Sequence, residues 1–161
     1  MPIRFAEKGD VDVIVKIAES TDYFKHDKVA LELIRSTILD LINIEKKDGG
    51  VLVYEDNGEM LGFISYRKEK ANVGVYWVSW FAVRKDVQRR GIGTLLMQEL
   101  EKIARAYGAR LLLVDTSGDD EWEPARVARR FYEKMGFKRV CVIPRYYWDE
   151  DSAVIYVKYL K

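Results

Sequence analysis

The sequence is poor in the residues that build metal centres and disulfide frameworks. It contains one cysteine, Cys141, and one histidine, His26, in a chain of 161 residues. A disulfide framework or a cysteine-rich metal site needs several cysteines, and a zinc site commonly draws on histidine as well. These counts exclude an internal disulfide framework, and we expect no metal site.

The chain also lacks a charge bias and a long apolar run. Its 27 Lys and Arg residues nearly balance its 26 Asp and Glu residues, which leaves a net charge of +1. General attraction to nucleic acid or to an anionic membrane is therefore not expected. No segment is apolar over the roughly 20 residues that a membrane span needs, and no secretory signal is visible. We expect a cytoplasmic protein.

Side-chain amides are scarce too. The chain has two glutamines and three asparagines, beside abundant Lys, Arg and Glu. This composition is typical of thermophilic proteins. It hints at a thermophilic source, which bears on stability and not on activity.

The spacing of apolar residues predicts one domain, residues 1–161, because a chain of this length can bury a substantial core. Strands are expected near residues 3–6, 51–54, 60–66, 75–83, 111–114, 139–143 and 153–157. Helices are expected near 10–18, 27–45, 91–107 and 124–135. This order predicts an α/β fold (an α+β mixed sheet) of about seven strands flanked by about four helices.

Several local details follow from the same pass along the chain. Asp10 precedes an apolar helix and is a plausible N-cap. Asn57 and Gly58 form the dipeptide typical of a type I′ hairpin turn. Residues 144–151 are expected to be a loop between the last two strands. Cys141 alternates with apolar neighbours and is expected to be a small buried side chain.

The chain is organised around residues 77–107, where a buried apolar strand leads through the turn Gln88–Gly93 into an amphipathic helix. The first turn of a helix has unpartnered N–H groups and partial positive charge. Glycines at 91 and 93 allow close approach to the backbone, and Arg89 and Arg90 add full charge. The turn therefore favours a phosphate or pyrophosphate, although the glycines could also serve only to close it.

Two familiar phosphate motifs fit this turn poorly. The dinucleotide fingerprint needs a third glycine where the chain has Leu96, although Asp115 lies near the distance expected for its acidic residue. The Walker sequence is absent.

The turn Gln-Arg-Arg-Gly-Ile-Gly resembles the Q/R-x-x-G-x-G/A motif of the GNAT acetyltransferase superfamily. A second segment, residues 128–137, looks like the A-x-x-F-Y-x-x-x-G-F signature that follows the fifth strand in that family. The order of elements matches the GNAT fold along essentially the whole chain. The resemblance implies that acetyl-coenzyme A binds here, and the residues implied in binding it are Phe81, Ala82, Val83, Gln88, Arg89, Arg90, Gly91, Ile92, Gly93 and Thr94.

The implied activity is acetyl transfer from acetyl-coenzyme A to a primary amine, by direct attack in a ternary complex. A non-catalytic acyl-coenzyme A sensor is the alternative, and a nucleotide-binding oxidoreductase domain is a more distant one. A homodimer is also considered.

In the family, the tyrosine at the position of Tyr132 commonly protonates the departing thiolate; the alternative is a core tyrosine packed beside Phe131. Some members carry a glutamate base on the central strand, which has no carboxylate here. Asp115, at the end of the next strand, is the candidate base, although such acids more often bond turn amides, and a water chain is the alternative.

In the family, the acceptor site is built from the first helical pair and the last strand connection, so the resemblance implies the same place here. These supply Tyr23, Phe24, Tyr146 and Trp148, whose ring faces suit a cationic amine. The acidic run at residues 149–151 is expected to be solvated. The lone histidine is expected at the surface.

Overall fold

The computed structural model describes residues 2–161 and shows a seven-stranded mixed sheet with four α-helices. The fold class expected from the sequence is therefore confirmed. The strands are β1 Ile3–Phe5, β2 Gly49–Asp56, β3 Glu59–Lys68, β4 Val75–Val83, β5 Leu111–Ser117, β6 Lys138–Trp148 and β7 Asp151–Tyr159. The helices are α1 Val11–Ser20, α2 Lys28–Ile42, α3 Ile92–Ala106 and α4 Glu123–Lys134.

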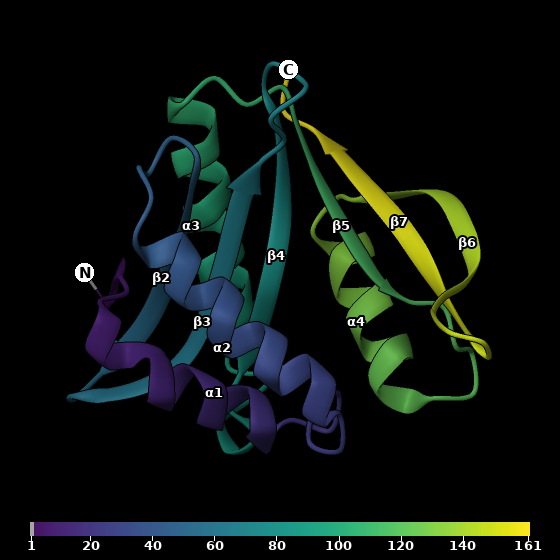
Figure 1. Cartoon of the computed structure of the whole chain (residues 1–161), viewed down its shortest axis with the longest axis horizontal. Helices are drawn as coiled ribbons and strands as arrows, with labels where there is room; N and C mark the ends of the chain where they lie inside the picture. Colours follow the sequence, from purple (N-terminus) through teal and green to yellow (C-terminus); the bar gives the residue numbers. More distant parts are fainter. Residues whose placement is uncertain (1) are drawn as a thin grey trace.

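The sheet has the strand order β1-β2-β3-β4-β5-β7-β6 (Figure 1). β4 and β5 run parallel, and the other neighbouring pairs run antiparallel. The parallel pairing covers only residues 75–77 and 111–113. Past these residues the two strands diverge, which leaves residues 78–83 of β4 and 114–117 of β5 unpaired with each other. We call this divergence the strand opening.

Helices cover both faces of the sheet, with α1 and α2 on one side and α3 and α4 on the other. One core contains Leu96, Leu100 and Tyr132, and the other contains Ile14, Ile34 and Phe63. β4 contributes Val78 to the first core and Ala82 to the second. Burial on both faces explains why this strand is a near-continuous apolar run. Within residues 2–161 no helix is long and apolar enough to cross a membrane.

A β-bulge shapes the part of β4 that borders the strand opening. Ile64 pairs with Phe81 but Tyr66 pairs with Val78, so β4 carries one extra residue opposite Ser65. The buried Ser65 hydroxyl accepts a hydrogen bond from the Trp80 N–H at 2.7 Å and donates one to the Trp80 carbonyl at 3.1 Å. The bulge bends this edge of the strand away from a straight ladder.

The hairpin turn at residues 57–58 is confirmed, since both residues have positive φ as a type I′ turn requires. Asp10 occupies the N-cap position before α1, as expected, but its side chain makes no capping hydrogen bond to this helix. A 3-10 turn precedes α1 and holds Asp10 at φ −86° and ψ −12°, away from the extended conformation of a capping residue. Its carboxylate instead accepts from the Glu7 N–H at 2.7 Å and from the Arg4 guanidinium at 2.8 Å.

Two expectations about β6 are wrong. Cys141 is exposed, because β6 is the edge strand of the sheet and nearly all its residues face solvent. The expected loop at 144–151 is largely strand, with a turn only at residues 149–150. Ile143 pairs with Ala153 and Trp148 with Asp151. Residues 144–147 of β6 therefore lie opposite the single residue Ser152 of β7 and form a large bulge.

Candidate active site

The turn before α3 has the geometry of an anion-binding site. Gly91 caps the helix with φ +84°, and a Cβ placed there would meet no atom within 4 Å. The first helical hydrogen bond runs from the Leu95 N–H to the Gly91 carbonyl at 3.1 Å. The preceding amides, at residues 92–94, therefore have no helical acceptor and can bind an anion. Arg89 and Arg90 are exposed beside them.

Packing and one hydrogen bond fix this turn to the end of β4. The Gln88 side-chain amide donates to the Val83 carbonyl at 2.9 Å. Ile92 is buried, so its side chain anchors the helix and only its backbone faces the turn. A Cβ at Gly93 would lie 3.2 Å from the Phe81 ring. Glycine at 93 therefore allows the helix to approach the strand.

The edge of β4 that faces the strand opening carries free backbone donors. The Trp80 N–H donates to the Ser65 hydroxyl, and the Arg84 N–H donates to the Leu61 carbonyl at 2.8 Å. The N–H groups of Trp80 and Arg84 are therefore directed towards β3. Because alternate residues of a strand direct their N–H groups to opposite edges, those of Phe81 and Val83 face the opening. Ala82 differs, since its methyl group is buried in the second core and its N–H is directed at β3.

Tyr132 on α4 is part of the first core and lies near Tyr23 and Asp115. It is 8% exposed. The centroid of its ring lies 5.6 Å from that of Phe131, 5.8 Å from that of Phe137 and 6.1 Å from that of Tyr156. Burial raises the pKa of its phenol, and the nearby Tyr23 and Asp115 raise it further. The hydroxyl has no hydrogen-bond partner among residues 2–161. Because its pKa is raised, the phenol stays protonated, and its proton is free to be donated.

Asp115 lies on β5 two residues beyond the last residue paired with β4. Its Oδ2 accepts a hydrogen bond of 2.6 Å from the Tyr147 hydroxyl. Burial raises the pKa of Tyr147, and the adjacent Asp115 carboxylate raises it further. The sequence places Tyr147 in the run of aromatic residues expected near the acceptor, but that run, residues 146–148, does not reveal which side chain turns inward.

Tyr23 closes the same region from the loop between α1 and α2. Its hydroxyl lies 3.0 Å from Thr116 Oγ1 and accepts from the Ser117 N–H at 3.0 Å. Burial raises the pKa of this phenol. Its ring lies 4.9 Å from Trp122, which adds an aromatic side chain that the sequence did not single out.

The other expected acceptor residues lie at the edge of this cluster or outside it. The Phe24 ring centroid is 4.8 Å from that of Tyr23, and the Tyr146 ring centroid is 5.0 Å from that of Tyr147. Phe24 is buried in the second core with its ring 5.9 Å from Trp80. Tyr146 and Trp148 are 53% and 58% exposed on the outer strand. His26 is exposed, as expected.

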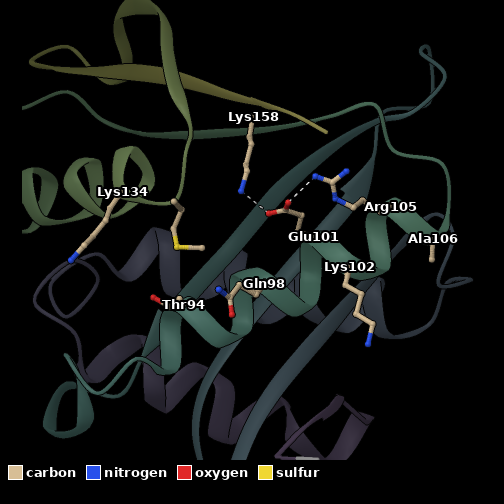
Figure 2. A pocket seen from close by; sticks show the side chains of 9 residues that line it. Thr94, Gln98, Glu101, Lys102, Arg105, Ala106, Lys134 and Lys158 are labelled. Carbon is tan, nitrogen blue, oxygen red and sulfur yellow. Dashed lines mark hydrogen bonds and ion pairs between the residues drawn. The ribbon is translucent and has the colours of Figure 1, made fainter. Parts of the chain in front are cut away.

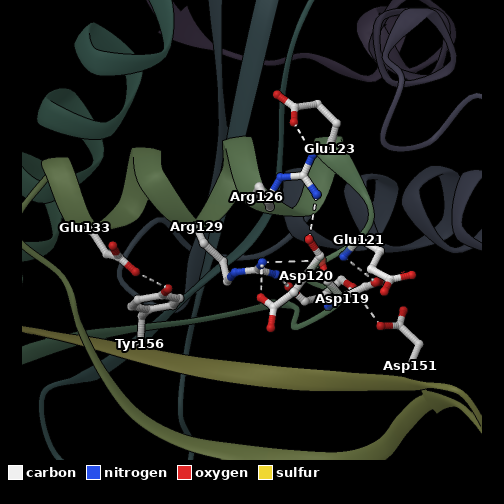
Figure 3. A network of polar contacts seen from close by, with 10 residues as sticks. Asp119, Asp120, Glu121, Glu123, Arg126, Arg129, Glu133, Asp151 and Tyr156 are labelled. Carbon is white, nitrogen blue, oxygen red and sulfur yellow. Dashed lines mark hydrogen bonds and ion pairs between the residues drawn. The ribbon is translucent and has the colours of Figure 1, made fainter.

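A polar network holds the end of β5 (Figure 3). Arg129, only 5% exposed, donates to the Ser117 carbonyl at 2.6 Å and to Asp120 Oδ1 at 2.9 Å. Ser117 Oγ donates to Asp151 at 2.7 Å. The expected solvation of the run 149–151 is thus wrong for Asp151, although the two acids before it are exposed.

An open groove of about 990 Å³ continues from the start of α3 towards the end of α4 and β7 (Figure 2). Glu101 lies in it and accepts from Lys158 at 2.7 Å and from Arg105 at 3.1 Å. Lys102 and Lys134 also line the groove, so its charge is mainly positive. Within residues 2–161 no cluster of three or more His, Cys, Asp or Glu side chains is placed to hold a metal ion.

Comparison with known proteins agrees with this geometry. Residues 47–139 match the family described as acetyltransferase (GNAT) domain. An N-alpha-acetyltransferase of Sulfurisphaera tokodaii is 27% identical over 95% of this chain and 89% of that protein. A GNAT-family crystal structure from Desulfovibrio desulfuricans superposes with a TM-score of 0.87 at 26% identity, over 99% of this chain and 98% of that one.

A crystal structure of an aminoglycoside 6′-N-acetyltransferase complexed with coenzyme A shares the fold, with a TM-score of 0.76 at 20% identity over 100% of this chain and 98% of that one. The predicted family and activity, acetyl transfer from acetyl-coenzyme A to an amine, are therefore confirmed. The chain belongs to the GNAT acetyltransferase family.

Proposed function

We propose that residues 1–161 act as one domain that acetylates the α-amino group of a peptide or amino acid, by direct attack in a ternary complex. The observation that carries this proposal is the strand opening, which has an anion-binding turn on one side and a cluster of Tyr23, Asp115, Tyr132 and Tyr147 within it. The name of the Sulfurisphaera relative supports an α-amine as the acceptor.

The donor would bind along the β4 side of the opening. The amides at residues 92–94, with Arg89 and Arg90, would hold its pyrophosphate. The N–H groups of Phe81 and Val83 would bond its pantetheine arm and polarise the thioester carbonyl. The positive groove beside α3 would face the remaining anionic part of the donor.

Acetyl-coenzyme A supplies an acetyl thioester when bound. Asp115 would take a proton from the acceptor ammonium, which gives a neutral amine and a protonated carboxyl group. The amine nitrogen would then bond to the acetyl carbon as the carbon–sulfur bond breaks. Tyr132 would donate its phenolic proton to the departing sulfur and regain one from the new amide nitrogen. Positioning of the two reactants would supply much of the rate.

A screen of acceptors tests this proposal. The panel contains tetra-alanine with a free α-amine, N-acetyl-lysine amide, spermidine and kanamycin, and thiol release reports transfer. We expect release with tetra-alanine alone. Release only with the lysine derivative, spermidine or kanamycin would refute the α-amine acceptor. Tight binding of acetyl-coenzyme A by calorimetry, without release for any amine, would favour the sensor.

We also propose a cytoplasmic location and a homodimer formed through β6. The outer strand exposes Val140, Val142 and Trp148, and edge strands of this kind tend to pair. Basic residues lie at its start (138–139) and acidic residues just past its end (149–150). A second copy related by a two-fold axis would run antiparallel and set these opposite charges against each other.

A further inference from the structure

Tyr147 differs from every other residue of β6. The remaining residues of this strand are exposed, whereas Tyr147 is half-buried and bonded to Asp115. β7 lies between β6 and β5 in the sheet, so the hydrogen bond reaches across an intervening strand. Neighbouring strands lie about 4.8 Å apart, and an unbulged edge strand would leave its side chains beside β7.

The bulge in β6 is what makes this reach achievable. From Ile143 to Trp148 the strand advances five residues, while the paired segment of β7 covers two. Arg145 adopts φ +59° within the bulge, a conformation that is unfavourable for a residue with a side chain. Such strain persists where other interactions hold it, and it often marks a functional position. Arg145 lies two residues before Tyr147, in the bulge that brings the Tyr147 hydroxyl to Asp115.

Asp115 is a half-buried acid that is bonded to a tyrosine and not to a cation. Its partner is a neutral phenol, and within residues 2–161 no lysine, arginine or histidine forms an ion pair with it. The groups that face it are Tyr23, Tyr132 and Tyr147, which bring no positive charge. An ammonium group could therefore approach this carboxylate without displacing a cation of the chain.

The two carboxylate oxygens of Asp115 therefore have different environments. Oδ2 is occupied by Tyr147, whereas Oδ1 has no hydrogen-bond partner among residues 2–161. The phenol cannot donate to both oxygens, because it has one proton. Tyr147 thus fixes the rotation of the carboxylate and leaves one oxygen for another donor.

We propose that Tyr147 is a positioning residue for the acceptor amine, which holds Asp115 so that Oδ1 receives the acceptor's ammonium group. The proposal rests on the function proposed above and adds a residue to its acceptor site. The acceptor ammonium donates a hydrogen bond to Oδ1 and then transfers that proton to it. The amine is left neutral, and Tyr147 keeps its own proton throughout.

Kinetics of Tyr147→Phe test this role with tetra-alanine as the acceptor. The change removes one hydroxyl and keeps the ring. A hydrogen bond to a charged group is worth about 1.5 kcal/mol, so we expect KM for tetra-alanine to rise about tenfold. KM for acetyl-coenzyme A should not change. Tyr159→Phe, at an exposed tyrosine on β7, is the matched control and should leave both values unchanged.

A double-mutant cycle separates positioning from general stability. Asp115→Asn should lower kcat/KM strongly, and adding Tyr147→Phe should cost little more, because the tyrosine acts through the carboxylate. The positioning role is overturned if the fold losses in kcat/KM of the two single variants multiply in the double variant. It is also overturned if Tyr147→Phe lowers only the melting temperature.

Carbon-13 NMR of ring-labelled tyrosine provides a readout that needs no turnover. The Tyr147 signal is assigned by its loss in Tyr147→Phe. We expect it to move in Asp115→Asn and again when tetra-alanine is added to the protein with coenzyme A. A signal that ignores both changes overturns the proposal. Normal turnover with an unaltered KM in Tyr147→Phe would refute this role alone, whereas absence of wild-type turnover would refute the proposed function.

Discussion

At the scale of single residues, Gly91 and its neighbours decide whether an anion can reach the helix terminus. The positive φ of Gly91 and the open space around it allow close approach to the amides of α3. A carboxylate at this place would compete with a bound phosphate for the same donors.

We predict that Arg90→Glu combined with Gly91→Asp weakens coenzyme A binding by at least 100-fold. The two changes place negative charge where the phosphates would lie and fill the approach path. Isothermal titration calorimetry measures the affinity, and circular dichroism checks that the protein remains folded. Lys28→Glu, on α2, is the control for a charge reversal elsewhere on the surface. An affinity close to wild type would contradict the assignment of this turn.

Tyr132 is the second residue whose role can be measured directly. Tyr132→Phe should lower kcat about 100-fold, the lower end of what a general acid contributes. Binding of acetyl-coenzyme A should change less than twofold, because the ring still packs. Equal losses in both would indicate a packing role.

The pH profile adds a second test of Tyr132. Because burial raises the pKa of this phenol above its ordinary value of 10.0, it keeps its proton in alkaline solution. The wild-type kcat should therefore show no loss of this acid up to pH 10. Steady-state rates between pH 7 and 10 check the expectation.

At the scale of elements, the link between α3 and β7 beside the groove depends on Glu101. Burial alone would raise the pKa of this carboxyl, but hydrogen bonds from Lys158 and Arg105 outweigh it and lower the pKa below the ordinary value of 4.5. The ionised carboxylate therefore stabilises the folded state at pH values above 4.5. This contribution is lost as the pH falls through the lower pKa of the folded protein.

We predict that Glu101→Gln lowers the free energy of unfolding at pH 7 by about 1.5 kcal/mol, the value of hydrogen bonds to a charged group. The difference from wild type should shrink below pH 4. Chemical denaturation at both pH values measures it. Glu99→Gln on the same helix is the control. An equal difference at pH 7 and pH 3 would show that the carboxylate charge is not responsible.

At the scale of the whole molecule, the exposed outer strand predicts self-association. Light scattering after size-exclusion chromatography should give twice the chain mass of 18.8 kDa. Val142→Lys adds charge to the centre of β6 and should yield monomers. Val127→Lys, at an exposed position of α4, should leave the dimer intact. A wild-type monomer across micromolar concentrations would rule out the proposed dimer.

The sequence by itself determined the features that depend on neighbours along the chain. The apolar run at 75–83 fixed a strand buried on both faces, and Asn57-Gly58 fixed a hairpin. The glycines at 91 and 93 marked a turn that could bind phosphate. The order of elements then determined the fold class, because each signal is local and several agree.

The tertiary structure alone decided which distant residues meet. Asp115 and Tyr147 come together although β7 separates their strands, because a bulge carries the tyrosine past β7. Cys141 is exposed because its strand lies at the sheet edge. The alternation of side chains along a strand shows which residues share a face, but it does not show whether a neighbouring element covers that face. Coverage depends on strand order, which is set by packing of the whole chain.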